Sequence, residues 1–172
     1  YGLLANTNNG TIESCAVLPQ ESFPFRAQYS YTKDVTPNVY IGVMVGENKG
    51  TIKESFVANP YGYFEVSVSC VYNDSYSGEQ TDLDRKLYVG GLVGKNSGSI
   101  LDSYVKMAGI SITPEENGTD NNISAVSGED GEMSEETETQ NIISAISGVD
   151  GENAEYERVF YNNDIEMNYS SG

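Results

Sequence analysis

Short apolar runs, each followed by turn-forming residues, recur along the first two thirds of the chain. Three of these runs are too short for a helix and have the length of a buried strand. They are Leu3-Leu4-Ala5, Val43-Met44-Val45 and Leu92-Val93. The segments around them align as residues 2–12, 42–52 and 90–100, at offsets of 40 and 48 residues. So many matched positions predict an internal structural repeat.

The position directly after each apolar run is occupied by glycine or asparagine. It is Asn6 in the first copy, Gly46 in the second and Gly94 in the third. Both residue types reach positive φ at low cost, so this exchange predicts a left-handed turn residue. A second tight bend is predicted four residues later in each copy. The glycines of this second bend are Gly10, Gly50 and Gly98.

One asparagine lies between the two predicted bends of each copy, as Asn8, Asn48 and Asn96. Its amide can hydrogen-bond its own turn or the matching asparagine one coil away, which would form a ladder. An isoleucine follows the second glycine in each copy and is expected to point inwards. These residues are Ile12, Ile52 and Ile100. An acidic residue and a serine follow in each copy. When these serines are aligned, the first copy lacks one residue between Ile12 and Ser14.

The order strand, bend, strand, bend predicts an all-β, parallel β-solenoid with a β-helix-like winding. Further strand-like segments are predicted at residues 25–31, 64–72 and 105–110, with residues 73–86 as a loop. We expect one solenoid domain over residues 1–172, of roughly 4–6 coils with loop insertions. Residues 1–108 hold the three clear repeats.

The acidic C-terminal part, residues 109–172, holds a shorter and degenerate repeat. Residues 123–132 match residues 143–152 at an offset of 20, which predicts two further short coils. The acidic run 133–139 is expected to be an exposed loop, and residues 159–164 the last strand and its turn. Open ends of a solenoid expose strand edges and need caps. Because the chain begins directly inside a motif, we expect it to be a piece of a longer protein.

The repeat is clearest at residues 90–104, where it reads GGLVGxNxGxIxxSY. This pattern resembles the GLUG motif of bacterial surface and secreted proteins, such as IgA-specific metallopeptidases and adhesin-like chains. The first copy departs from the motif at Asn6, and the second has Ile41 where the family favours a glycine. The resemblance implies a β-solenoid module on the outside of a bacterial cell, and it implies nothing about a reaction.

Charge and composition argue against several classes of partner and site. Lys and Arg number 9 against 26 Asp and Glu, giving a formal net charge of -17. A phosphate-backbone partner is therefore not expected, because nucleic-acid binders need clustered cations. The chain has no His, which excludes histidine-based triads and histidine metal sites. No apolar run approaches the length that a membrane span needs, so membrane insertion is not expected either.

The chain has two cysteines, Cys15 and Cys70. Cys70 follows the alternation of Phe64 and Val66, which indicates a small buried residue on one face of a strand. Free thiols are the favoured interpretation, with a Cys15–Cys70 bridge as the alternative. Two cysteines without histidine do not complete a zinc site of the usual type.

Two kinds of binding site can be sought among the remaining side chains. Acidic turns could hold calcium, although they match no known calcium-loop pattern. The calcium candidates are Glu129, Asp130, Glu132, Asp150 and Glu152. Aromatic rings could stack on a glycan, although Tyr40, Tyr88 and Tyr104 recur at matched positions, which favours packing between coils. The glycan candidates are Tyr29, Tyr31, Tyr61, Tyr63 and Tyr76.

These observations favour a non-catalytic module over an enzyme, because no pair of carboxylates is singled out for catalysis and the cations are scattered. We expect an extracellular stalk, spacer or adhesin-like repeat module, at the cell surface or secreted, joined to flanking domains of the same longer chain. No cofactor is expected, with calcium as an alternative. The other hypotheses are a module that binds a host glycan or protein, and an accessory domain of a secreted peptidase whose catalytic residues lie elsewhere.

Overall fold

The computed structural model of the chain describes residues 1–20, 23–31, 38–72, 86–114, 119–124, 139–144, 146–161 and 166–169. Every regular element within these ranges is a β-strand, and every pairing between two of these strands is parallel. The sequence-based expectation of an all-β chain with parallel sheets is thereby confirmed. The predicted strand segments at 25–31, 64–72 and 105–110 lie within β4 (Phe23–Tyr31), β8 (Phe56–Tyr72) and β12 (Tyr104–Pro114).

The strands form four parallel sheets, numbered here in the order in which the chain passes through them. Sheet 1 contains β5 (Val39–Gly42), β9 (Lys86–Gly90), β14 (Thr139–Ser144) and β13 (Thr119–Ser124), in that order. Sheet 2 contains β1 (Ala5–Asn8), β6 (Val45–Asn48), β10 (Val93–Asn96) and β15 (Ser147–Asp150). Sheet 3 contains β2 (Thr11–Glu13), β7 (Thr51–Lys53), β11 (Ser99–Leu101) and β16 (Glu155–Glu157). Sheet 4 contains β3 (Ala16–Val17), β8, β12 and β17 (Phe160–Tyr161), with β4 paired to β8 and β18 (Glu166–Tyr169) paired to β12.

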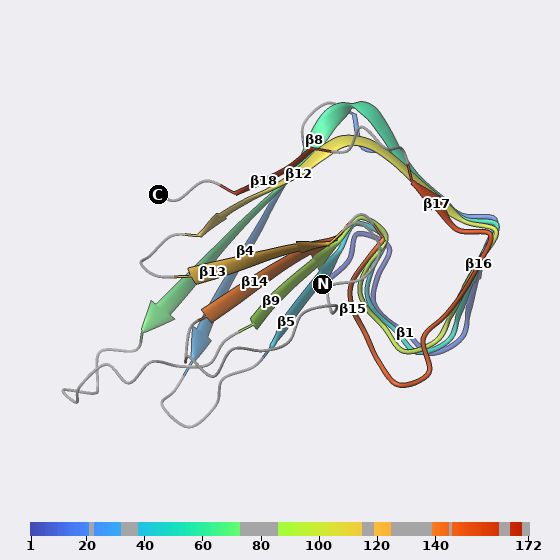
Figure 1. Cartoon of the computed structure of the whole chain (residues 1–172), viewed down its shortest axis with the longest axis horizontal. Coiled ribbons are helices and arrows are strands. Elements are labelled where there is room, and N and C mark those ends of the chain that lie inside the picture. Colours follow the sequence, from blue (N-terminus) through green and yellow to red (C-terminus); the bar gives the residue numbers. More distant parts are fainter. Residues whose placement is uncertain are drawn as a thin grey trace.

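One passage of the chain through the sheets, with one or two strands in each sheet, makes one layer of the stack. Layer 1 comprises β1–β4, layer 2 β5–β8, layer 3 β9–β12 and layer 4 β14–β18. Figure 1 shows the corresponding turns of layers 1–3 nearly superposed, with the orange turn of layer 4 between β15 and β16 following a wider path. The aligned repeat positions are direct neighbours between layers, because Ile12 pairs with Ile52 and Ile52 with Ile100. The offsets of 40 and 48 residues read from the sequence are therefore the spacings between layers.

The core lies between the sheets and runs along the stack. Ile52 and Ile100 are fully buried, as expected, whereas Ile12 in the end layer is only half-buried. Met44, Leu92 and Ile146 are buried in layers 2, 3 and 4. Burial of each such aliphatic side chain contributes about 1.5–3 kcal/mol of transfer free energy. The stability of the stack therefore depends mainly on contacts between adjacent layers.

The predicted left-handed turn after each apolar run is wrong. The non-glycine residues with positive φ in the described chain lie elsewhere, at Ser14, Glu54, Asp102 and Arg158, with φ between 47 and 53°. Gly46 and Gly94 do not have positive φ. Glycine is required there because the strand of the preceding layer passes too close: a Cβ on Gly94 would lie 2.7 Å from the carbonyl carbon of Tyr40.

The alignment with a missing residue in the first copy is also wrong. Glu13 pairs with Lys53, so Ser14 occupies the same corner position as Glu54. Both residues share the left-handed backbone and hydrogen-bond to the next layer, from Ser14 N to Lys53 O at 3.2 Å and from Glu54 N to Leu101 O at 3.2 Å. These bonds offset the cost of positive φ in residues that have a Cβ.

The degenerate C-terminal repeat also occupies matched positions. β13 and β14 are parallel neighbours with Ile123 opposite Ile143, which is the offset of 20 read from the sequence. Residues 143–152 enter layer 4, while residues 125–138, including the predicted acidic loop, lie outside the described residues. The strand predicted within 159–164 is present as β17, but the expectation that it is the last strand is wrong, because β18 follows and pairs with β12. The turn predicted at its end lies outside the described residues. Residues 73–85 of the predicted loop also lie outside the described residues.

Candidate functional site

A row of buried asparagines occupies the corner between sheets 2 and 3. Asn8 Nδ2 donates to Asn48 Oδ1 at 2.8 Å, and Asn48 Nδ2 donates to Asn96 Oδ1 at 2.8 Å. The asparagine side chain also bonds within its own bend, since Gly10 N donates to Asn8 Oδ1 at 3.1 Å. Both predicted roles of the asparagines, the ladder and the local turn, are therefore present. Asn48 and Asn96 are fully buried. Asn48 is bonded through both of its amide atoms, whereas Nδ2 of Asn96 has no hydrogen-bond partner in the described part of the chain.

A second row, of serines, lies at the corner between sheets 3 and 4. Ser55 Oγ accepts the backbone N–H of Cys15 at 3.1 Å, and Ser103 Oγ accepts that of Ser55 at 3.2 Å. Each hydroxyl donates in turn to the carbonyl two residues earlier, from Ser55 to Lys53 and from Ser103 to Leu101, both at 2.7 Å. The hydroxyls are buried and doubly bonded, which leaves them no role as nucleophiles.

Aromatic residues also pair between layers, one pair with a buried member and one at the surface. The rings of Tyr40 and Tyr88 stack with centroids 5.2 Å apart, as their matched positions predict. Tyr104 belongs to a different row, because its ring stacks on Phe56 at 4.7 Å with the planes only 3° apart. Phe160 occupies the same position in layer 4 and is 64% exposed. The sequence aligns Phe56 with Tyr104, since each directly follows a serine of the serine row, but the ring packing expected of Tyr104 was with Tyr40 and Tyr88, which is wrong.

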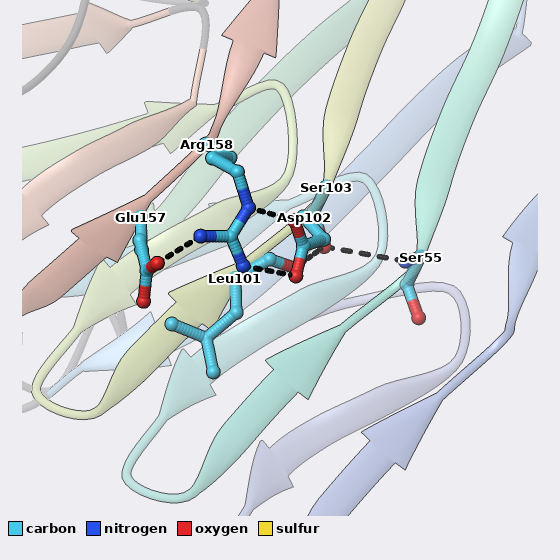
Figure 2. Close-up of polar contacts among 6 residues, drawn as sticks. All are labelled: Ser55, Leu101, Asp102, Ser103, Glu157 and Arg158. Carbon is cyan, nitrogen blue, oxygen red and sulfur yellow. Dashed lines mark hydrogen bonds and ion pairs between the residues drawn. The ribbon is translucent and has the colours of Figure 1, made fainter.

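A charged cluster caps the corner next to the serine row. Arg158 forms an ion pair with Asp102, with Nη2 donating to Oδ2 at 2.7 Å, and a second one with Glu157. Figure 2 shows the guanidinium between the two carboxylates, beside the hydrogen bond that joins Ser55 to Ser103. The hydrogen bond from Arg158 lowers the pKa of Asp102 below its ordinary value of 3.8. All three side chains are exposed, so the cluster joins layers 3 and 4 at the surface without forming an enclosed site.

A small cavity of about 250 Å³ lies at the layer 4 end of the core. Its lining residues are Ile146, Tyr156, Arg158, Val159 and Tyr161. The hydroxyl of Tyr156 donates to Asp150 Oδ1, and burial together with this hydrogen bond raises the pKa of Tyr156 above its ordinary value. A phenol held in this way stays protonated at neutral pH and does not act as a general base. The cavity is thus lined mainly by aromatic and aliphatic surface.

The calcium candidates do not come together in the described part of the chain. Asp150 lies beside Asn96, at the position of the asparagine row in layer 4, and accepts the hydroxyl of Tyr156. Glu152 is exposed, and Glu129, Asp130 and Glu132 lie outside the described residues. No group of three or more acidic, cysteine or histidine side chains is positioned to hold a metal ion among the residues that the structure describes.

The glycan candidates do not form a single platform either. Tyr61 is 94% exposed and Tyr63 is half-buried, both near the middle of β8. Tyr29 pairs with Cys70, seven residues beyond Tyr63 on β8, which corresponds to roughly 20 Å along a strand. Tyr31 lies two residues further, the side chains of Tyr29 and Tyr31 are not described, and Tyr76 lies outside the described residues. Only Tyr61 among these five presents a well exposed ring in the described chain.

Cys15 is a free thiol, which excludes the alternative of a bridge to Cys70. Its Sγ donates to the carbonyl of Glu13 at 3.3 Å, so it takes the place of the serine hydroxyl in layer 1. The side chain of Cys70 is not described, and its predicted burial stays a prediction.

Asn8, Asn48, Ser55 and Ser103, and the ring pairs Tyr40–Tyr88 and Phe56–Tyr104, are thus engaged between adjacent layers. The described residues include no helix with the length and apolar character of a membrane span. Comparisons with known protein families, with curated proteins and with solved structures found no match for this chain.

Proposed function

We propose that the chain is a parallel β-solenoid of the GLUG-motif type and serves as a non-catalytic repeat module of a larger extracellular bacterial protein. Its role would be that of a stalk, spacer or adhesin-like surface. The resemblance of residues 90–104 to the GLUG motif supports the extracellular, bacterial setting. The parallel stacking of matched repeat positions supports the solenoid winding.

One observation carries the structural role: the residues that define the repeat bond to each other. Asn48 is bonded to both of its counterparts, in layers 1 and 3, and Ser103 accepts the N–H of Ser55. A catalytic or binding repeat would instead direct recurring side chains towards a ligand. In this chain the repetition stabilises the stack, which is what a spacer needs.

The experiment that tests this proposal is a binding and turnover screen of the purified chain against glycans, host extracellular proteins, and glycoside and peptide substrates. A spacer gives neither saturable binding nor turnover. Turnover that persists through repurification would contradict the non-catalytic role, and saturable binding would favour the second candidate below.

The second candidate is a glycan- or protein-binding module, and two exposed aromatic rings favour it. Tyr61 is 94% exposed and Phe160 is 64% exposed. The other two rings in the row of Phe160, those of Phe56 and Tyr104, stack on one another. Rings of this kind supply large contact area at a binding surface. If this candidate is right, Tyr61→Ala or Phe160→Ala weakens binding at least tenfold. Glu152→Gln should not, because this exposed acid lies between the strands of sheets 2 and 3 whereas both rings belong to sheet 4.

A further inference from the structure

An asparagine that is followed directly by glycine lies on an exposed bend of layer 1. The two residues are Asn9 and Gly10, between β1 and β2, and both are exposed. The register of β1, β6 and β10 aligns Asn9 with Lys49 and Ser97. Lys49 is exposed as well, although its layer has a neighbour on each side, so exposure at this position is a property of the corner. Layers 2 and 3 therefore lack a side-chain amide at the place where layer 1 has one.

The backbone nitrogen of Gly10 can attack the side-chain amide of Asn9. The nitrogen first loses its proton to a base in the solvent, and it then forms a bond to Cγ of Asn9. The bond from Cγ to Nδ2 breaks, Nδ2 takes up a proton from water, and it leaves as ammonia. A succinimide ring results, and water opens this ring to aspartate or isoaspartate. Glycine favours the attack because it has no Cβ that restricts the backbone.

The fold restrains the attacking nitrogen. Gly10 N donates to Oδ1 of Asn8 at 3.1 Å, so the proton that the reaction must remove is held in a hydrogen bond. Asn8 is buried, and its own Nδ2 donates to Asn48 Oδ1 at 2.8 Å and to Thr51 O at 3.2 Å. These two bonds fix the side chain of Asn8 with its oxygen towards Gly10. The protecting acceptor is therefore part of the asparagine row.

The backbone on both sides of Asn9 is also bonded to layer 2. Lys49 N donates to Asn8 O and Thr51 N donates to Gly10 O, both at 2.8 Å. The nitrogen of Gly10 turns towards Cγ of Asn9 only when the bend opens, and the open bend is a minor state of the folded chain. An isoaspartate at this position adds one carbon to the backbone between the two bonded carbonyls, so it would disturb their fit to layer 2.

We propose that Asn9 is a site of spontaneous deamidation whose rate is set by the hydrogen bond from Gly10 to Asn8. The asparagine row then has a second effect besides aligning the layers, because its layer 1 member suppresses a chemical change in the neighbouring residue. Folding slows the reaction, and local opening of the bend permits it. The co-reactant is water, and no cofactor takes part.

Peptide mapping by mass spectrometry of the purified chain, incubated in mildly alkaline buffer, tests this proposal. The wild-type chain should convert at Asn9, and conversion at Asn153, an exposed asparagine followed by Ala154, should be much slower. Unfolding in urea should speed conversion at Asn9 by about fivefold or more, because the hydrogen bond to Asn8 is lost. Gly10→Ala should nearly stop conversion, and this variant should fold because nothing lies within 4 Å of the added Cβ.

Asn8→Ala tests the assigned role of Asn8 in the folded chain, and Asn48→Ala is its matched control. Both variants remove an amide of the row, but only Asn8→Ala frees the N–H of Gly10, so it should speed conversion several-fold more than Asn48→Ala. Circular dichroism verifies that both variants keep the wild-type strand content. Three results would overturn the proposal: no conversion at Asn9, equal rates in the folded and the unfolded wild-type chain, or equal acceleration by the two variants. The first two results need no variant.

Discussion

Asn48 Nδ2 donates a hydrogen bond to Asn96 Oδ1 at 2.8 Å, although the two residues are 48 positions apart in the sequence. Asn48 also accepts from Asn8 and donates to the carbonyl of Gly50 at 3.3 Å. A fully buried amide in such a row is fixed by both neighbours, so each layer sets the register of the next. The asparagine row therefore holds the corners of adjacent layers opposite one another, in the same register as the paired strands.

The first prediction concerns this row. Asn48→Ala should lower the free energy of unfolding by about 2–4 kcal/mol, since it removes the side-chain bonds to Asn8 and Asn96, removes those to the carbonyls of Gly50 and Ser99, and leaves a buried gap. Asn48→Asp keeps the shape but cannot donate to Asn96, and it buries a charge, so it should destabilise the chain at least as much at neutral pH. Urea unfolding measures both values.

The matched control for the row is Asn9→Ala, because Asn9 is exposed and adjacent to the same bend. It should change the free energy of unfolding by less than about 0.5 kcal/mol. An Asn48→Asp variant as stable as wild type would show that the donated bond to Asn96 is unimportant.

The second prediction compares a glycine that directly follows an apolar run with a glycine of the second bend. Gly94→Ala should destabilise the chain by about 3 kcal/mol or more, because its Cβ would lie 2.7 Å from the carbonyl carbon of Tyr40 and 2.8 Å from Gly46 O. Gly10→Ala places its Cβ in open space, with nothing within 4 Å, and should cost less than about 1 kcal/mol. Thermal unfolding followed by circular dichroism measures the difference. Equal effects at the two sites would argue against close contact between layers at Gly94.

How far the sequence predicts this structure can be judged from the same positions. The asparagine ladder could be foreseen because Asn8, Asn48 and Asn96 recur in one context and an amide can both donate and accept. The role of Gly94 could not, because local propensity allows positive φ, whereas the actual constraint comes from a strand 54 residues away. A glycine that is needed because a neighbouring strand lies too close looks the same in the sequence as a glycine that is needed for a turn.

The true left-handed corner was not predictable from residue type. Glu54 and Arg158 are not residue types that favour positive φ, and aspartate at Asp102 does so only occasionally. The backbone of Glu54 and Asp102 is held by hydrogen bonds to the following layer. The stacking of Tyr104 on Phe56 was likewise hidden, because matching by residue type joined Tyr104 to Tyr40 and Tyr88. Among the candidate ligand-binding residues, sequence alone could not show that Tyr29 and Tyr63 lie far apart along one pair of strands.

The third prediction is a pH dependence of the charged corner. The hydrogen bond from Arg158 holds the pKa of Asp102 below 3.8, so the folded state favours the carboxylate more than the unfolded state does. This contribution to stability is present above about pH 4 and is lost as the pH falls through the lowered pKa. Asp102→Asn should therefore lower the melting temperature slightly at neutral pH and make no difference at the acidic end of the range.

The control for this prediction is Glu152→Gln, an exposed acid for which the described structure shows no ion pair. Its melting-temperature difference from wild type should not follow the same pH course. High salt should reduce the effect of Asp102→Asn, because the pair with Arg158 is exposed. An effect that grows as the pH falls would have the wrong sign and would contradict the assigned role of Arg158.

The measurement that tests the parallel layers most directly is a set of nuclear Overhauser contacts among the methyl groups of Ile12, Ile52 and Ile100. These residues are register partners in adjacent layers, about 4.8 Å apart for neighbours and about twice that across two layers. The structure predicts strong contacts from Ile52 to both of the others and a much weaker one or none between Ile12 and Ile100. A strong contact between Ile12 and Ile100, or no contact from Ile52 to either, would contradict the stacking order.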